Sequence, residues 1–445
     1  MKLRTRFLLL LAAGSLSASA ALGTVTVTVG TPADSSTLTS PVRITASATT
    51  SSPGAQVTGW HIYVDSNDAY GTSGPTSAID QTVALSTGDR TVVVRAWDST
   101  GAFGSQTMTL HVTAASAYQS NMDATAAWIA NSSTAGDGAI LYGTAKIVPY
   151  WSNLAALGLT RTPAYLPNVQ AWMEWYLNHL NWPDKWGIYG TVYDYDVAAN
   201  GTETSTGNAD STDSYAATFL SLARAYYQTG DANAQAYVST LDYQLDVIGG
   251  VIVQTQQSDG LTWAKPDYQI KYLMDNCEVY RGLSDLASLY QTAFNEPAKA
   301  SYYSARAAAV LQGIESMLWN PSANSYFPYA GAPAANWSTW YPDATSQLFP
   351  VLFGVIDPAG SRAAGLYSQF NTAFPNWPTL GIPDSFPWVL VSDAAALMGD
   401  TGRVDTYIAT IQDRYVSQGF PWPWYDAEAG WFIRVNSYRL GNRPL

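Results

Sequence analysis

The spacing of apolar residues changes its period once along this chain of 445 residues, close to residue 115. Before that point, short segments alternate apolar and polar side chains, which is typical of strands. Beyond it, apolar residues recur at helical spacing nearly to the end. Because one element cannot satisfy both periods, we predict a multidomain chain. An all-β unit is followed by an all-helical unit, with the boundary between residues 114 and 118.

Five segments of the first part show the alternation: 25–29, 42–46, 60–64, 91–97 and 107–112. Clusters of Gly, Ser, Pro, Asn and Asp separate them at intervals of ~10 residues, which is typical of an antiparallel sandwich. Residues 21–114 resemble bacterial immunoglobulin-like domains, in the segments 32–36, 63–65 and 95–101. The resemblance implies a β-sandwich fold without implying a ligand.

The N-terminus has the pattern of an export signal. Lys2, Arg4 and Arg6 precede a short apolar run, and small residues end at Ala20. We predict that residues 1–20 are a signal peptide, cleaved near Ala20 to leave a secreted or periplasmic protein. The rest of the chain has no apolar run of ~20 residues, so no membrane anchor is expected. The single cysteine, Cys277, rules out an intrachain disulfide.

The net charge of −13 disfavours nucleic acid as a partner. Aromatic residues make up 13% of the chain and charged residues only 12%, so many aromatics must lie near the surface or in a cleft. Flat rings in a cleft suit sugars, although core packing is the alternative for each ring. We therefore expect a carbohydrate as the ligand. We also expect a monomer without a cofactor.

The helical part contains a weak internal repeat. Four expected helix starts carry an acidic residue near the cap, at Asp210, Asp275, Asp343 and Asp384. Each follows an aromatic-rich loop and leads into an apolar segment. A ring of helical hairpins requires such units, because each can bury its apolar face only against its neighbours. The acidic positions are then expected to converge around one cleft.

Residues 117–440 resemble the six-hairpin glycosidase superfamily, whose fold is an (α/α)6 toroid. The segments that carry the resemblance are 137–140, 149–156, 210–219 and 274–276, with Tyr280. The resemblance is one of architecture and spacing, and it assigns no particular family. It implies a toroid used by many glycoside hydrolases and by some polysaccharide lyases.

Hydrolysis of a glycosidic bond needs two carboxyl groups, one protonated and one ionised. Asp210 and Asp213 share one face of an expected helix start, and Asp275 and Glu278 repeat the spacing. We predict that Asp210 caps the helix while Asp213 projects into the cleft toward Asp275. Glu278 and Asp343 are further catalytic candidates. Helix capping alone is the alternative interpretation of each of these acids.

Aromatic and basic residues of the long loops are the expected substrate-binding groups. They are Trp182, Trp186, Trp263, Lys265, Trp340, Tyr341 and Trp388.

The sequence lacks the residues that metal-dependent, serine-hydrolase and nucleotide-dependent reactions need. His179 is the single histidine of the helical part, which leaves no usual zinc site, and no metal is expected. Neither a serine-hydrolase elbow nor a phosphate-binding glycine loop is present. Two alternatives stay open beside a glycoside hydrolase: a polysaccharide lyase on the same toroid, and a non-catalytic carbohydrate-binding surface protein.

Overall fold

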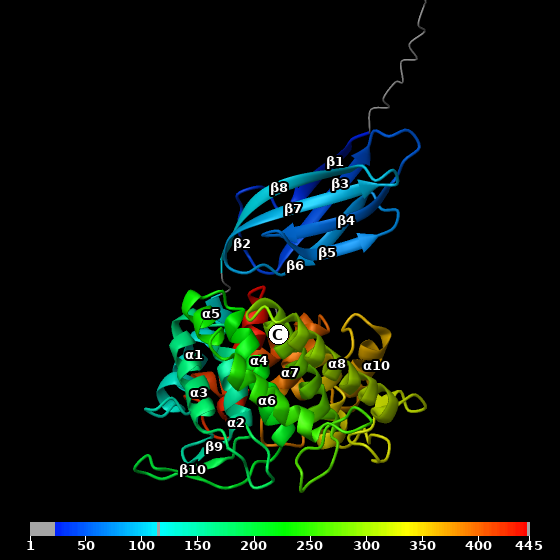
Figure 1. Ribbon diagram of the computed structural model, residues 1–445. Helices are drawn as coiled ribbons and strands as arrows, with labels where there is room; N and C mark the ends of the chain where they lie inside the picture. The colour runs from blue at the N-terminus through cyan, green and yellow to red at the C-terminus, as the bar shows by residue number, and fades with distance from the viewer. Residues whose placement is uncertain (1–22, 114–115, 443–445) are drawn as a thin grey trace, which may run out of the picture. The chain divides into compact units, whose positions relative to one another are not determined.

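The computed structural model describes residues 23–113 and 116–442 (Figure 1). The chain divides into two compact units, with the boundary directly after Thr113. The expected signal peptide, residues 1–20, lies outside the described residues. Among the described helices, none combines the length and the apolar character that crossing a membrane requires.

Residues 23–113 form eight strands in two sheets. The strands are β1 (Val25–Thr31), β2 (Thr37–Thr39), β3 (Val42–Thr50), β4 (Val57–Val64), β5 (Asn67–Ser73), β6 (Ala78–Val83), β7 (Gly88–Asp98) and β8 (Phe103–Thr113). One sheet has the order β1-β3-β6 and the other the order β2-β8-β7-β4-β5. Trp60 and Ile62 on β4 and Val92 and Val94 on β7 are fully buried, and they alternate with more exposed neighbours. The predicted β-sandwich is confirmed.

The alternating pattern does not predict β2, β5 or β6. β2 is only three residues long, and β5 contains no buried residue, so neither shows a buried face in its sequence. β2 pairs with β8 and β5 with β4, and each adds one partly buried residue, Leu38 and Tyr70, to the core of the sandwich.

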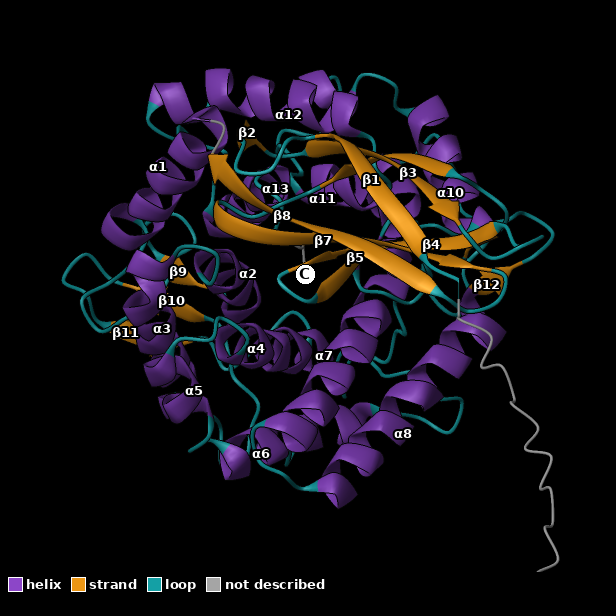
Figure 2. Ribbon diagram, turned by 90° about the horizontal axis from the view of Figure 1, so that it is seen from above, coloured by secondary structure: helices purple, strands orange, loops and turns teal. Residues whose placement is uncertain are grey.

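Within residues 116–442, six helices form an inner ring and six surround it (Figure 2). The outer helices are α1 (Ser116–Ser132), α3 (Leu166–Asn178), α6 (Asp242–Thr255), α8 (Pro297–Gly313), α10 (Ser361–Ala373) and α12 (Thr401–Arg414). The inner helices are α2 (Pro149–Leu159), α4 (Thr212–Tyr227), α7 (Leu273–Thr292), α9 (Phe349–Leu352), α11 (Leu390–Leu397) and α13 (Asp426–Arg439). Each inner helix contacts the next, and α13 contacts α2, which closes the ring. The predicted (α/α)6 toroid is confirmed.

The burial of each helix explains its place. Along α13, 12 of 14 residues are buried, so this helix needs neighbours on all sides. Along α12, only Val404, Tyr407, Ile408 and Ile411 are buried, which is the single apolar stripe of a surface helix. Where α2 and α13 cross, a Cβ atom at Gly158 would lie 2.5 Å from the backbone of Gly430. Glycine is therefore required for this close approach.

Shorter elements join the hairpins. α5 (Ala232–Val238) precedes α6, and α8 is followed directly by a π-helical turn, η2 (Ile314–Leu318). A second π-helical turn, η3 (Trp340–Ala344), precedes α9. The 3-10 turns are η1 (Pro163–Tyr165), η4 (Trp377–Thr379) and η5 (Val416–Gln418). The loop strands are β9 (Lys146–Ile147), β10 (Tyr195–Val197), β11 (Glu203–Ser205), β12 (Trp319–Asn320) and β13 (Ser325–Tyr326).

Candidate active site

A cleft lies at the N-terminal ends of the inner helices. All six inner helices contribute residues to its wall, among them Tyr150, Tyr215, Asp275, Phe349, Leu390 and Glu428. Its volume is about 690 Å³. A neighbouring hollow of about 630 Å³ shares Asp210, Ser211, Met274, Asp275 and Tyr341 with it. We refer to both together as the cleft.

Six carboxyl groups line the cleft: Asp194, Asp210, Asp267, Asp275, Glu278 and Glu428. Asp194 lies in the loop before β10, and Asp210 lies two residues before α4. The last three belong to the first two turns of α7 and α13. In the order of contacts around the ring, α7 is third and α13 is sixth. The carboxyl group of Glu428 therefore lies across the ring from those of α7.

The two carboxyl groups of α7 favour their protonated forms. Burial, followed by the charges of Asp213 and Glu278, raises the pKa of Asp275 well above its usual range. Burial also raises the pKa of Glu278 to about 8, although the hydroxyl group of Tyr150 donates to its Oε1 at 2.5 Å. Desolvation disfavours a charged carboxylate, so this side of the cleft holds protons at neutral pH.

Glu428 is held by two consecutive backbone N–H groups. Its Oε1 accepts the N–H of Trp388 at 3.0 Å, and its Oε2 accepts the N–H of Val389 at 2.7 Å. Burial raises the pKa of Glu428 to about 7 in spite of these bonds. Both oxygen atoms are thus oriented, and the ionised form is accessible near neutral pH.

Asp194 and Asp210 lie on the α4 side of the cleft. The hydroxyl group of Tyr215 donates to Oδ1 of Asp194 at 2.7 Å, and burial raises the pKa of Asp194 to about 6. Asp210 is exposed, and its side chain makes no hydrogen bond to another described residue.

The predicted arrangement at the start of α4 is wrong. Asp213 is fully buried and is not among the residues that line the cleft. Its Oδ1 accepts the hydroxyl of Ser211 at 2.6 Å and the N–H of Ser214 at 2.8 Å, and its Oδ2 accepts the hydroxyl of Thr262 at 2.5 Å. The helix is capped by Ser211 rather than by Asp210. Because the cap lies one residue later than expected, Asp213 turns into the protein and Asp210 into the cleft.

Asp343 and Asp384 also lie outside the cleft lining. Oδ1 of Asp343, in the π-helical turn η3, accepts the N–H of Asn336 at 2.7 Å. Oδ2 of Asp384 accepts the indole N–H of Trp388 at 2.8 Å. Each acid therefore stabilises a local turn, and the expected convergence of all four acidic helix starts is wrong for these two.

Three of the seven expected substrate-binding residues line the cleft: Lys265, Tyr341 and Trp388. Trp340 is 4% exposed and packs against Phe370 and Phe374, so its expected place in the cleft is wrong. Trp182, Trp186 and Trp263 are also outside the lining. Their loops are long, but these rings are directed elsewhere; Trp182, for example, stacks with Tyr243.

The sequence patterns miss an aromatic cluster at the α2 and α13 side of the cleft. The ring of Tyr142 lies 4.3 Å from that of Trp151 and 5.3 Å from that of Tyr425, between ring centroids. Phe386 packs against the same Tyr425 at 5.4 Å. These residues come from four separate segments, so only the fold brings them together.

Groups suited to other chemistry are not gathered in the part of the chain that the structure describes. No three or more His, Cys, Asp or Glu side chains within residues 23–113 and 116–442 are placed to hold a metal ion. Cys277 is buried with a free thiol. His179 stacks on Trp175 at 3.9 Å between ring centroids and is not part of the cleft.

No protein-family model matches the chain, and no curated protein matches it in sequence. Solved structures are similar to it in fold. A wild-type glycosidase has a TM-score of 0.53 at 13% identity, covering 73% of this chain and 97% of its own. A glycosidase variant in complex with glucose has a TM-score of 0.52 at 14% identity, with the same coverage. A rhamnosidase from Klebsiella oxytoca with rhamnose bound has a TM-score of 0.50 at 11% identity, covering 90% of this chain and 88% of its own.

Proposed function

We propose that this protein is a secreted glycoside hydrolase that cleaves a neutral oligo- or polysaccharide with a pair of carboxyl groups. The observation that carries the proposal is the position of Glu428 across the ring from Asp275, in one cleft with aromatic walls. Glycoside hydrolysis uses carboxyl groups on either side of the scissile bond.

Asp275 is the proposed general acid. It lies where the two parts of the cleft meet, so a sugar chain lying along the cleft passes over it. Its raised pKa keeps a proton available to the leaving oxygen at neutral pH. The hydroxyl group of Ser211 lies 3.4 Å from Oδ2 of Asp275 and helps to orient it.

Glu428 is the proposed base or nucleophile. A pKa of about 7 leaves part of the population ionised at neutral pH, and the two backbone N–H groups hold the ionised form in one orientation. The anomeric configuration of the product separates the two roles. Retention of configuration indicates attack by Glu428 on the sugar, and inversion indicates an activated water.

The charges around the cleft favour a neutral sugar. Three lysines line it, and each is already engaged: Lys146 lies 3.7 Å from Asp196, Lys185 lies 4.0 Å from Asp267, and Lys265 donates to the carbonyl oxygen of Ala209 at 2.8 Å. Six carboxyl groups against three engaged lysines give a poor site for a polyanion.

The tyrosines of the cleft favour hydrolysis over a lyase reaction. A tyrosine that acts as a base must lose its proton. Burial, together with the neighbouring Glu278, raises the pKa of Tyr150 well above its usual range, and burial with Asp194 does the same for Tyr215. Both hydroxyl groups donate to those carboxyl groups. They act as hydrogen-bond donors in this arrangement.

The similarity of fold to solved structures also supports a carbohydrate substrate, but more weakly. The similar structures are glycosidases and a rhamnosidase, and two of them hold glucose or rhamnose. Many functions share one fold, so the carboxyl groups and aromatic walls of the cleft support a sugar substrate more strongly than the fold does.

The test is cleavage of a panel of neutral and acidic oligosaccharides by the purified protein. We expect new reducing ends from a neutral glycan and no unsaturated sugar product. The variant Asp275→Asn should lose turnover by about 10²–10⁴-fold, while Asp343→Asn, a helix-start acid outside the cleft, should keep it. A folded protein that cleaves no neutral glycan, or an Asp275→Asn variant as fast as the parent, contradicts the proposal.

Export is a separate part of the proposal, and it rests on residues 1–20. The mass of the protein recovered from the periplasm or the medium should correspond to a chain that begins near Ala21. Recovery of the full chain with Met1 in the cytoplasm contradicts export.

A further inference from the structure

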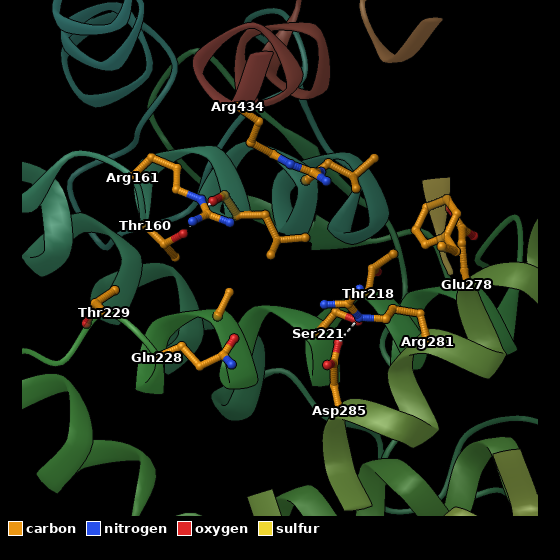
Figure 3. Close-up of a pocket in the computed structure, with 14 residues that line it drawn as sticks. Thr160, Arg161, Thr218, Ser221, Gln228, Thr229, Glu278, Arg281, Asp285 and Arg434 are labelled. Carbon is orange, nitrogen blue, oxygen red and sulfur yellow. Dashed lines mark hydrogen bonds and ion pairs between the residues drawn. The ribbon is translucent and has the colours of Figure 1, made fainter. Parts of the chain in front are cut away.

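A second, smaller cavity lies toward the C-terminal ends of the inner helices (Figure 3). It is lined by Arg161, directly after α2, by Ser221 on α4, by Arg281 on α7 and by Arg434 on α13. Its volume is about 80 Å³. A single water needs about 10–15 Å³ measured in this way, so the cavity has room for a small ion and its water.

Three guanidinium groups from separate segments surround this cavity. Figure 3 shows Arg161 and Arg434 on one side of it and Arg281 on the other. Burial, followed by the charge of Arg281, lowers the pKa of Arg161. Arg434 is only 2% exposed, and burial lowers its pKa as well. Guanidinium groups remain protonated in proteins, so the three charges repel one another inside the fold.

The carboxyl groups nearby do not balance these charges. Asp285 accepts from Nε of Arg281 at 2.7 Å, and the buried Asp393 interacts electrostatically with Arg434 and Arg161. Burial raises the pKa of both carboxyl groups, which favours their neutral forms. Glu278 also lines the cavity, and burial raises its pKa to about 8, so at neutral pH it favours its neutral form and adds little negative charge.

Arg161 contributes most to the imbalance. Its side chain is half-buried, and it makes no hydrogen bond or ion pair with any described residue. The carbonyl ends of α2 and α4 lie at this end of the ring and offset part of the positive charge. They leave the donors of the Arg161 guanidinium without a protein acceptor, so these donors are available to an anion in the cavity.

We propose that this cavity binds a small inorganic anion, from halide to phosphate in size, between Arg161, Arg281 and Arg434. Charge-assisted bonds from guanidinium groups are strong, and planar guanidinium groups suit oxyanions as well as halides. The exposed Gln228 lines the same cavity and marks its opening to solvent. Because the three arginines belong to separate segments of the ring, a bound anion links α2, α7 and α13.

The first test uses the full chain and its melting temperature. Tm is measured in sodium chloride and in sodium gluconate at equal ionic strength, because gluconate is too large for the cavity. We expect Tm to be about 2 °C higher in chloride once the chloride concentration is about five times its Kd. The variant Arg161→Met should lose this difference. The control Arg414→Met removes an arginine whose side chain is 69% exposed, and it should keep the difference.

The second test locates the ion and does not depend on a variant that folds. Crystals of the parent protein soaked in sodium bromide should show an anomalous peak between the three guanidinium groups. Repeating the melting experiment in phosphate identifies the better ligand: a larger shift in phosphate assigns an oxyanion, and a larger shift in chloride assigns a halide. Equal Tm values in all salts with no bromide peak in the cavity overturn the proposal, as does a chloride response that persists in Arg161→Met.

Discussion

Glu428 accepts the backbone N–H of Trp388 at 3.0 Å, and Trp388 holds a left-handed backbone conformation with a φ of 54°. A bulky residue in this region costs about 1–3 kcal/mol, and such strain is concentrated at functional sites. Here the conformation directs two consecutive N–H groups at one carboxylate. The start of α13 is thereby tied to the segment that precedes α11, its neighbour in the ring.

Replacing Glu428 by Gln should lower kcat by about 10³-fold or more, because the amide cannot act as a base or a nucleophile. Its NH2 group also faces a backbone N–H group, so a lower Tm is expected. Steady-state kinetics on the cleaved glycan and a melting curve check both effects. The matched variant Asp384→Asn changes another acid that contacts Trp388 and should keep most of the activity. Full activity of Glu428→Gln would exclude Glu428 from the chemistry.

The start of α4 leads to a second prediction. Asp213 accepts three hydrogen bonds inside the protein, so Asp213→Asn should lower the free energy of unfolding by about 1–3 kcal/mol. Turnover per folded molecule should change by less than about tenfold, because the side chain does not reach the cleft. Asp210→Asn is the control for stability, since Asp210 is exposed. Denaturant titrations measure both variants, and loss of turnover in Asp213→Asn at unchanged stability would return Asp213 to the mechanism.

The dependence of stability on pH gives a third prediction. Burial raises the pKa of Glu278 to about 8, whereas a glutamate in the unfolded chain has a pKa of about 4.3. Between these values the folded protein holds a proton that the unfolded chain has lost. Glu278 therefore contributes stability that is complete below about pH 4.3 and is lost as the pH rises to about 8. Glutamine cannot lose a proton, and its oxygen can still accept the hydroxyl of Tyr150.

The variant Glu278→Gln should accordingly lose less Tm than the parent between about pH 5 and pH 8, and it should be the more stable protein at pH 8. Part of the slope should remain, because burial also raises the pKa of Glu428 and Asp275. The control is Glu174→Gln, which changes an exposed residue on α3 and should leave the slope as it is. Identical slopes in the parent and Glu278→Gln would contradict the raised pKa.

The sequence predicts most of the fold because buried apolar residues recur at regular spacing in both units, at helical spacing in one and at every second residue in the other. Val404, Tyr407, Ile408 and Ile411 form one helical stripe, and Trp60 and Ile62 alternate along a strand. The inner helices are harder to predict in detail. α13 is buried on all sides and has no stripe, so its boundaries depend on neighbours that are remote in sequence.

The candidate site is predicted only in part. Asp210, Asp275 and Glu278 line the cleft, but the roles expected for Asp210 and Asp213 depend on a cap one residue away from the observed one. The pattern that indicates Asp275 also indicates Glu428 as a candidate. Residues 420–428 form an aromatic-rich segment that ends in acidic residues at a helix start, which is the signal that selected Asp275. Its hydrogen bonds to Trp388 and Val389 could not be foreseen, because they require the ring to close.

Tyr341 and Trp340 are adjacent in sequence and should behave in opposite ways. The ring of Tyr341 is 56% exposed and lines the cleft, whereas that of Trp340 is 4% exposed and packs in the core. Tyr341→Ala should weaken glycan binding by about 1–3 kcal/mol with little effect on Tm. Trp340→Ala should lower the free energy of unfolding by about 3–5 kcal/mol through the cavity that it creates.

Trp182→Ala, which removes a 50% exposed residue outside the cleft, is the control and should change neither quantity. Titration of tryptophan fluorescence with the glycan and thermal melting separate these outcomes, and equal affinity in the parent and Tyr341→Ala would place the sugar elsewhere in the cleft.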